Sequence, residues 1–135
     1  DELLIAFKLM YLTKEIKKQS KSVFSNSNLS TFDEYSFLLH LEMADSFRKM
    51  ELVEMHNLEA PTGIEILKRL LKNQLVEEYP DHEDKRAKRD SITPAGRAEI
   101  TRLKPQLDVV LSRVSKPLSL YERVQFSGIL DKLIH

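Results

Sequence analysis

The run from Pro61 to Gly96 constrains the fold more than any other stretch, because its hydrophobic pattern changes period twice. Apolar residues first recur at helical spacing, with polar residues on the opposite arc. Two short extended stretches follow, LVEEY and KRDSIT, and a turn over 80–84 joins them. Thr93 and Pro94 then match the N-cap and first position of another helix. This order predicts a helix with a polar outer face and a charged hairpin, the pattern of a winged helix.

Two helical patterns precede this run. We expect a helix over 3–20, because apolar residues recur on one face at Ile5, Leu9, Leu12 and Ile16. A second helix over 31–44 is apolar on nearly every side, and Thr31 with Glu34 matches a capping box at its start. A helix of this kind needs to be covered all round, so it should lie at the centre of the fold.

Cap signals complete the predicted fold. Asp45 or Ser46 can cap a short helix that ends near Asn57, and this helix would form a helix-turn-helix with the next one. After the hairpin we expect a long helix and a last helix opened by a capping box over 119–122. The predicted fold class is mainly α with a small β wing (α+β). The winged helix-turn-helix occupies 31–97, and helices over 1–20 and 100–135 flank it.

The flanking helices predict a homodimer. Their apolar stripes leave too little of a 135-residue chain to cover them, so a second copy is expected to do so. We therefore interpret 1–20 and 100–135 as dimerisation helices.

Composition limits the class of protein. The chain is 41% hydrophobic, which suits one domain with a buried core. The lack of cysteine excludes a disulfide framework, a thiolate nucleophile and a cysteine-based zinc site. The longest uncharged run, between Lys21 and Asp33, is too short to span a membrane, and the acidic start is unlike a secretory signal. We expect a cytoplasmic protein with no membrane partner, and natural residues that precede Asp1.

Charge bears on nucleic-acid binding through its distribution. The 21 basic residues balance 21 acidic ones, whereas a typical DNA-binding domain is basic overall. Between Lys85 and Lys104, however, seven basic residues stand against two acidic ones. A basic turn alone is more often a solvated feature. Directly after a helix-turn-helix, the same cluster favours local DNA contact.

The string RLLKNQLVEEYPDHEDKRAKRDSITPAGR resembles the recognition-helix end and wing of the MarR family of bacterial transcriptional regulators. The family pattern is approximately R-L-x-x-x-G-L-V, then D-x-R, then T-x-x-G. The matches here are Arg69-Leu70, Leu75-Val76, Asp84-Lys85-Arg86 and Thr93-Pro94-Ala95-Gly96. The order of helices also fits, so the resemblance covers essentially the whole chain. Gln74 replaces the usual glycine, which implies a left-handed helix end that is strained at Gln74 or moved to Asn73.

The resemblance implies a homodimeric, ligand-responsive repressor that binds double-stranded DNA at a pseudo-palindromic operator. Recognition-helix contacts are expected at Pro61, Thr62, Gly63, Glu65, Lys68, Arg69 and Lys72. Wing contacts are expected at Asp84, Lys85, Arg86, Lys88 and Arg89. Arg86 is the key residue in this interpretation, with Asp84 as its ion-pair partner. Glu65 has two interpretations, a hydrogen bond from cytosine N4 or an ion pair with Arg69.

A small aromatic or apolar effector is also implied by the resemblance. The expected pocket is lined by Tyr11, Phe37, His40 and Met43. Aromatic residues on apolar faces are more often core, and that interpretation is favoured. The histidines at 40, 56 and 82 lack the spacing of helical metal ligands, so no metal is expected.

Enzyme motifs are missing from the sequence. It contains no G-x-S-x-G, no phosphate-cradling glycine loop and no H-E-x-x-H. We therefore expect no catalytic residues and no cofactor. The balanced charge and Glu65 leave one alternative function, a winged-helix module for protein–protein interaction without sequence-specific DNA binding.

Overall fold

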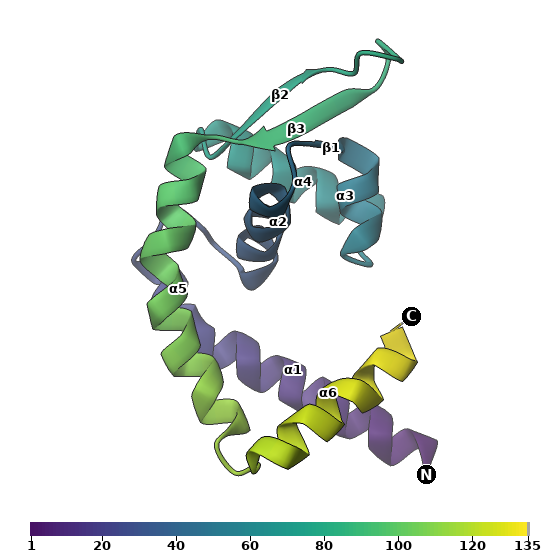
Figure 1. Cartoon of the computed structure of the whole chain (residues 1–135), viewed down its shortest axis with the longest axis vertical. Helices are drawn as coiled ribbons and strands as arrows, with labels where there is room; N and C mark the ends of the chain where they lie inside the picture. The colour runs from purple at the N-terminus through teal and green to yellow at the C-terminus, as the bar shows by residue number, and fades with distance from the viewer. Residues whose placement is uncertain (135) are drawn as a thin grey trace.

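The computed structural model describes residues 1–134, and His135, the last residue of the predicted segment 100–135, lies outside this range. The elements are α1 (Glu2–Ser25), α2 (Phe32–Met43), β1 (Phe47–Arg48), α3 (Lys49–Met55), α4 (Ala60–Lys72), β2 (Val76–Pro80), β3 (Lys88–Ile92), α5 (Pro94–Ser115) and α6 (Leu120–Ile134). A mainly α fold with a small β wing is confirmed. Figure 1 shows the β2–β3 hairpin at one end of the molecule and α1 and α6 at the other, with α5 running between them. No helix within residues 1–134 has both the length and the apolar composition that a membrane span requires.

The α2 helix lies at the centre of the core, as its apolar pattern predicted. Phe37, Leu38 and Leu41 are fully buried. The neighbouring helices α3, α4 and α5 add further fully buried apolar side chains to this core, among them Leu52, Leu67 and Leu103. Burial of a side chain of this size is worth about 1.5–3 kcal/mol, so α2 contributes strongly to the stability of this core.

The helix-turn-helix consists of α3 and α4. Asn57 has φ 52°, so the predicted left-handed residue does end α3. Gly63 brings the two helices into close contact, because a Cβ atom there would lie 2.6 Å from both Val53 methyl carbons. The start of α4 is therefore seated directly on α3.

The start of α3 differs from the prediction. Its N-cap is Arg48, which makes no side-chain capping hydrogen bond, so neither Asp45 nor Ser46 caps the helix. The chain instead forms the unpredicted strand β1, which pairs antiparallel with β3 and makes a sheet of order β1-β3-β2. The sheet places Phe47 opposite Asp90 and Arg48 opposite Arg89, and it ties the wing to the helix-turn-helix.

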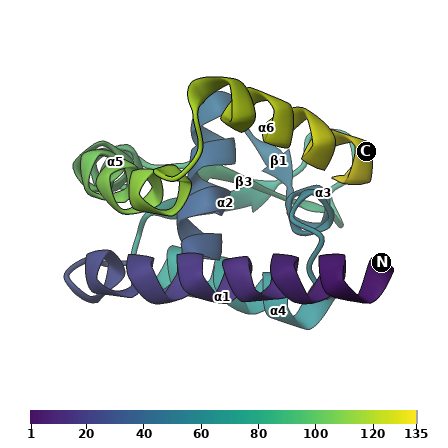
Figure 2. The same cartoon turned by 90° about the horizontal axis from the view of Figure 1, so that it is seen from below.

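The α6 helix stands apart from the core. It contains no buried residue within its described range, although its sequence is rich in apolar side chains. Its predicted capping box is present: the Ser119 N–H donates to Glu122 Oε1, and the Glu122 N–H donates to Ser119 Oγ. Viewed from below, α1 and α6 lie along opposite edges of this end of the molecule (Figure 2).

Candidate DNA-binding interface

The α4 helix presents an exposed polar face. Pro61 lies in its first turn, where its missing N–H costs no helical hydrogen bond. Thr62, Glu65, Lys68 and Lys72 are exposed along the helix and form what we call the reading face. Beside it, α4 and the start of α2 border a shallow cavity of about 440 Å³ whose lining includes Thr31, Thr62 and Glu65. The predicted recognition residues Pro61, Thr62, Glu65, Lys68 and Lys72 are therefore accessible to a duplex.

Gly63, predicted as a recognition residue, is not on this face. It is buried and turned toward Val53 of α3. The helical period explains the error, because positions 62 and 63 differ by about 100° around the helix. Gly63 serves the packing of α4 on α3 and does not offer an atom to DNA.

Arg69 is also assigned differently by the structure. Its guanidinium Nε donates to Oε1 of Glu34, a carboxylate that is only 1% exposed. The second oxygen of Glu34 accepts the Ser30 N–H. Arg69 is thus the counter-ion of a buried charge and joins α4 to the start of α2. The predicted alternative, an ion pair between Glu65 and Arg69, is not formed.

The wing is held by one buried carboxylate that the sequence analysis did not identify. Asp81 follows directly after β2, and its oxygens accept from Arg48 Nη2 and Arg89 Nη1, each at 3.0 Å. The N–H groups of Glu83 and Asp84 donate to the same side chain at 3.2 and 3.0 Å. Hydrogen bonds from Asp84 and Arg89 hold the pKa of Asp81 well below its usual range. The available sequence signal was an aspartate after proline at the start of a turn.

Arg89 was predicted to contact DNA and instead belongs to this network. Besides Asp81, its guanidinium reaches Ser46, donating to Oγ at 2.7 Å and to the carbonyl oxygen at 3.2 Å. These bonds connect β3 with the residue before β1. If Arg89 moved to contact a phosphate, Asp81 would lose one of its hydrogen-bond partners. The structural role of Arg89 therefore competes with its predicted contact to DNA.

Three cations at the wing are exposed to solvent, and within residues 1–134 none of them neutralises a buried carboxylate. Lys85, Arg86 and Lys88 are exposed, and the Arg86 side chain is 95% exposed. Asp84 Oδ1 accepts the Arg86 N–H at 3.0 Å and lies 3.4 Å from Arg86 Nε. The ion pair predicted for these two residues is therefore present, and it shapes the hairpin without burying the guanidinium. Such a side chain can enter a groove or contact a phosphate.

The junction between α4 and the wing explains two motif positions. Gln74 takes the left-handed conformation with φ 60°, whereas Asn73 does not. The Thr93 hydroxyl donates to the Gln74 carbonyl oxygen at 2.8 Å and so braces this strained residue. At Gly96 a Cβ atom would lie 2.3 Å from the Leu75 carbonyl oxygen, so only glycine allows α5 to start this close to the wing.

The predicted effector residues lie in different surroundings. Phe37 is buried, and its ring centroid is 4.3 Å from that of His56. The His40 ring packs edge-on against the same histidine, with centroids 4.6 Å apart. Tyr11 and Met43 are 69% and 79% exposed. The core interpretation fits Phe37, and the role of the set in binding a ligand stays a prediction.

Comparison with known proteins agrees with the winged-helix geometry described above. Residues 38–96 match the family model described as a winged helix DNA-binding domain. A probable transcriptional regulator from Pseudomonas aeruginosa is 26% identical, with 96% of each chain covered and a TM-score of 0.87. A MarR mutant from E. coli complexed with operator DNA is 20% identical, with 99% of this chain and 96% of that chain covered and a TM-score of 0.85. BpsR from Bordetella bronchiseptica, whose DNA binding is regulated by 6-hydroxynicotinic acid, is 20% identical, with 98% of this chain and 99% of that chain covered and a TM-score of 0.87. No curated protein matches the sequence.

The family match assigns residues 38–96 to the winged helix DNA-binding domains, and the order of helices and strands in this region agrees with that assignment. Within that class, the architecture of the whole chain is that of the MarR family of transcriptional regulators. The resemblance carried by residues 69–96 is thereby confirmed.

Proposed function

We propose that the protein is a homodimeric transcriptional regulator that binds a pseudo-palindromic operator and acts as a ligand-responsive repressor. One observation carries the proposal: α2, α3, α4, the sheet and the start of α5 share one core and form what we call the reading lobe, which bears both the polar reading face of α4 and the exposed cations of the wing. In this arrangement α4 enters a major groove and the wing tip contacts the adjacent minor groove or backbone. Local charge then supplies affinity although the net charge is zero.

The exposed apolar surface at the far end supports a homodimer. The first half of α1 and most of α6 expose large hydrophobic side chains, namely Leu3, Leu4, Ile5, Phe7, Met10, Tyr11, Leu120, Tyr121, Val124, Phe126, Ile129, Leu133 and Ile134. So many exposed apolar side chains at one end of a molecule are typical of an interface. A second copy related by a two-fold axis would cover it and place two α4 helices about 34–36 Å apart, one turn of DNA.

The experiment is a selection of random DNA by the purified protein, combined with sedimentation analysis of the free protein. We expect an inverted repeat with half-sites one helical turn apart, and a dimer at micromolar concentration. A stable monomer would contradict the dimer. The absence of any enriched sequence would favour the protein-interaction module instead.

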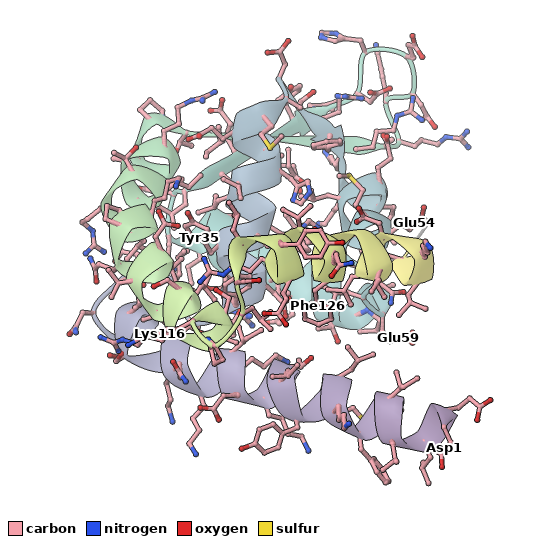
Figure 3. The ribbon with its side chains drawn as sticks, turned by 60° about the horizontal axis from the view of Figure 1, so that its bottom comes forward. Asp1, Tyr35, Glu54, Glu59, Lys116 and Phe126 are labelled. Carbon is pink, nitrogen blue, oxygen red and sulfur yellow. The ribbon has the colours of Figure 1, made fainter. Side chains whose placement is uncertain are left out.

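Ligand response is supported by a cavity of about 530 Å³ at the corner of α1, α5 and α6. Its lining is mostly apolar and includes Leu12, Val114 and Phe126. Figure 3 shows Phe126 between α6 and α1. The volume falls in the range of small-molecule sites, about 300–1,000 Å³. Filling it would change the angle of α6 and, through the dimer, the separation of the two reading lobes.

Thermal shift assays with small aromatic acids test this part of the proposal. We expect a compound that raises the melting temperature and alters DNA affinity. Leu12→Trp should abolish the response if the compound binds in this cavity, and His40→Ala should abolish it if the compound binds near the residues predicted from the sequence. If no compound changes either quantity, ligand response is contradicted.

A further inference from the structure

We propose that Glu65 reads a donor-bearing base, cytosine in the first place, at one position of each half-site. The inference rests on the proposed DNA binding and names a specificity-determining residue within it. It depends on three observations: where Glu65 lies on α4, which side chains could neutralise it, and what a duplex can offer a carboxylate.

Glu65 lies at the middle of the reading face. Each residue advances about 100° around an α-helix. On that count Thr62 lies about 60° to one side of Glu65 and Lys68 about 60° to the other, with Lys72 almost in line with Glu65 about two turns further on. A helix laid in the major groove along this face brings its central residue nearest to the base edges.

The cation best placed to neutralise Glu65 is committed elsewhere. Arg69 stands four residues later, at the usual spacing for a helical ion pair, but it bonds to Glu34. Glu34 is buried, and within the described part of the chain its other side-chain partner is the Ser30 N–H, so releasing Arg69 would leave a buried carboxylate without a counter-ion. Within residues 1–134, Glu65 forms no ion pair closer than 4.0 Å.

A duplex offers a carboxylate few favourable contacts. Phosphates and the guanine and thymine edges present acceptors, which repel it. Cytosine N4 and adenine N6 are the donors in the major groove, and carboxylate side chains pair with cytosine N4. An exposed Glu65 therefore weakens binding to most sequences and favours those with cytosine beneath it. Glu65 would thus select its base in two ways, by repelling bases that present acceptors and by accepting a hydrogen bond from the base that presents a donor.

The test is a selection of random DNA by wild type and by three variants, followed by titration of the selected duplexes. Wild type should enrich cytosine at one symmetric position of each half-site, and replacing that base should weaken binding about ten- to a hundredfold. Glu65→Gln should shift the preference to adenine, because an amide pairs with adenine N6 and N7. Glu65→Ala should lose the preference at that position alone.

Glu83→Gln is the matched control, since it removes the same charge from an exposed glutamate at the wing tip, 90% exposed. It should raise affinity for all sequences alike and keep the cytosine. If wild type selects an inverted repeat and both Glu65 variants retain its base preferences, the inference is overturned while the proposed function stands. If wild type enriches no DNA, the proposed function fails and the inference fails with it.

Discussion

Basic side chains on the reading lobe fall into two groups, those that pair with buried carboxylates and those that are exposed to solvent. Arg69 and Arg89 neutralise the buried carboxylates of Glu34 and Asp81, and they keep α4 and the wing in place. Lys85 and Arg86 neutralise no buried carboxylate within residues 1–134, and their side chains are exposed to solvent. At the residue scale, then, the proposed DNA contacts and the residues that support the interface carry the same charge and differ in burial and partners.

Arg86 is expected to supply the main wing contact. A dimer carries each contact twice, so Arg86→Ala should remove two phosphate contacts. The plot of log K against log salt should become less steep by about 1.8, that is about 0.9 for each phosphate contact. Arg86→Lys should restore the slope but not a preference for A·T-rich flanks, since lysine keeps the charge and lacks the planar guanidinium. The measurement is binding to one duplex across a salt series. A slope unchanged by Arg86→Ala would place the contacts elsewhere.

Substitution of Arg69, in contrast, should affect the stability of the protein more than the salt dependence of DNA binding. Arg69→Met keeps the length of the side chain but leaves the Glu34 carboxylate buried with one N–H partner, which should cost about 2–4 kcal/mol in the free energy of unfolding. Adding Glu34→Gln should recover part of this loss, because the amide is neutral. Urea denaturation measures both variants. Equal stability of Arg69→Met and wild type, with a reduced salt slope, would show that Arg69 contacts DNA after all.

At the scale of elements, the packing of α4 on α3 depends on Gly63. In an ordinary helix, replacing glycine by alanine stabilises the protein by roughly 0.5–1 kcal/mol. Here the added methyl group meets Val53, so Gly63→Ala should destabilise the protein by about 1–3 kcal/mol.

Val53→Ala makes room for that methyl group, so the two changes should be coupled. The double variant should be more stable than the sum of the single effects predicts, by about 1 kcal/mol or more. Additive effects, or a gain in stability from Gly63→Ala alone, would contradict the close contact between the helices.

The three-stranded sheet contains a pH-sensitive position. Asp90 on β3 is fully buried, and neither carboxylate oxygen has a hydrogen-bond partner within residues 1–134. Burial raises its pKa from 3.8 to about 6, with the charge of Glu78 acting in the same direction and that of Lys49 opposing it. The folded protein holds this proton more tightly than the unfolded chain, so the contribution of Asp90 to stability falls as the pH rises from about 4 to about 6.

Asp90→Asn removes this titration. We expect the melting temperature of the variant, relative to wild type, to rise between pH 4 and pH 7. The full difference between the two ionisation states is worth about 3 kcal/mol. Glu83→Gln, an exposed change in the same wing, should show no such trend. A difference between Asp90→Asn and wild type that is constant with pH would contradict the account.

Local patterns predicted the helices and both wing strands, and long-range contacts account for what was missed. Three of the predicted signals depend only on residues that lie within four positions of one another in sequence, and all three occur. They are the N-cap at Thr93, the left-handed conformation of Asn57 and the capping box at Ser119. Strand β1 has two residues and exists only by pairing with β3. Arg69 meets Glu34 across 35 positions of sequence. The polar face of α4 was therefore predictable, but the removal of Arg69 from it was not.

The whole molecule divides into a reading lobe with its own core and two apolar arms. The core around α2 joins α3, α4, α5 and the sheet, so the reading face and the wing are packed on the same core. The arms, α1 and α6, keep most of their apolar side chains exposed in the single chain. Dimerisation through the arms would fix the distance between two reading lobes, and the proposed ligand would alter DNA affinity by favouring one distance over another.

A fluorescence-anisotropy titration of labelled genomic DNA fragments with the purified protein, repeated across a salt series, tests the central claim most directly. The account predicts saturable binding of specific fragments at low salt by two protomers per site, with affinity that falls steeply as salt increases. Flat titration curves at low salt, from a protein shown to be folded, would contradict it.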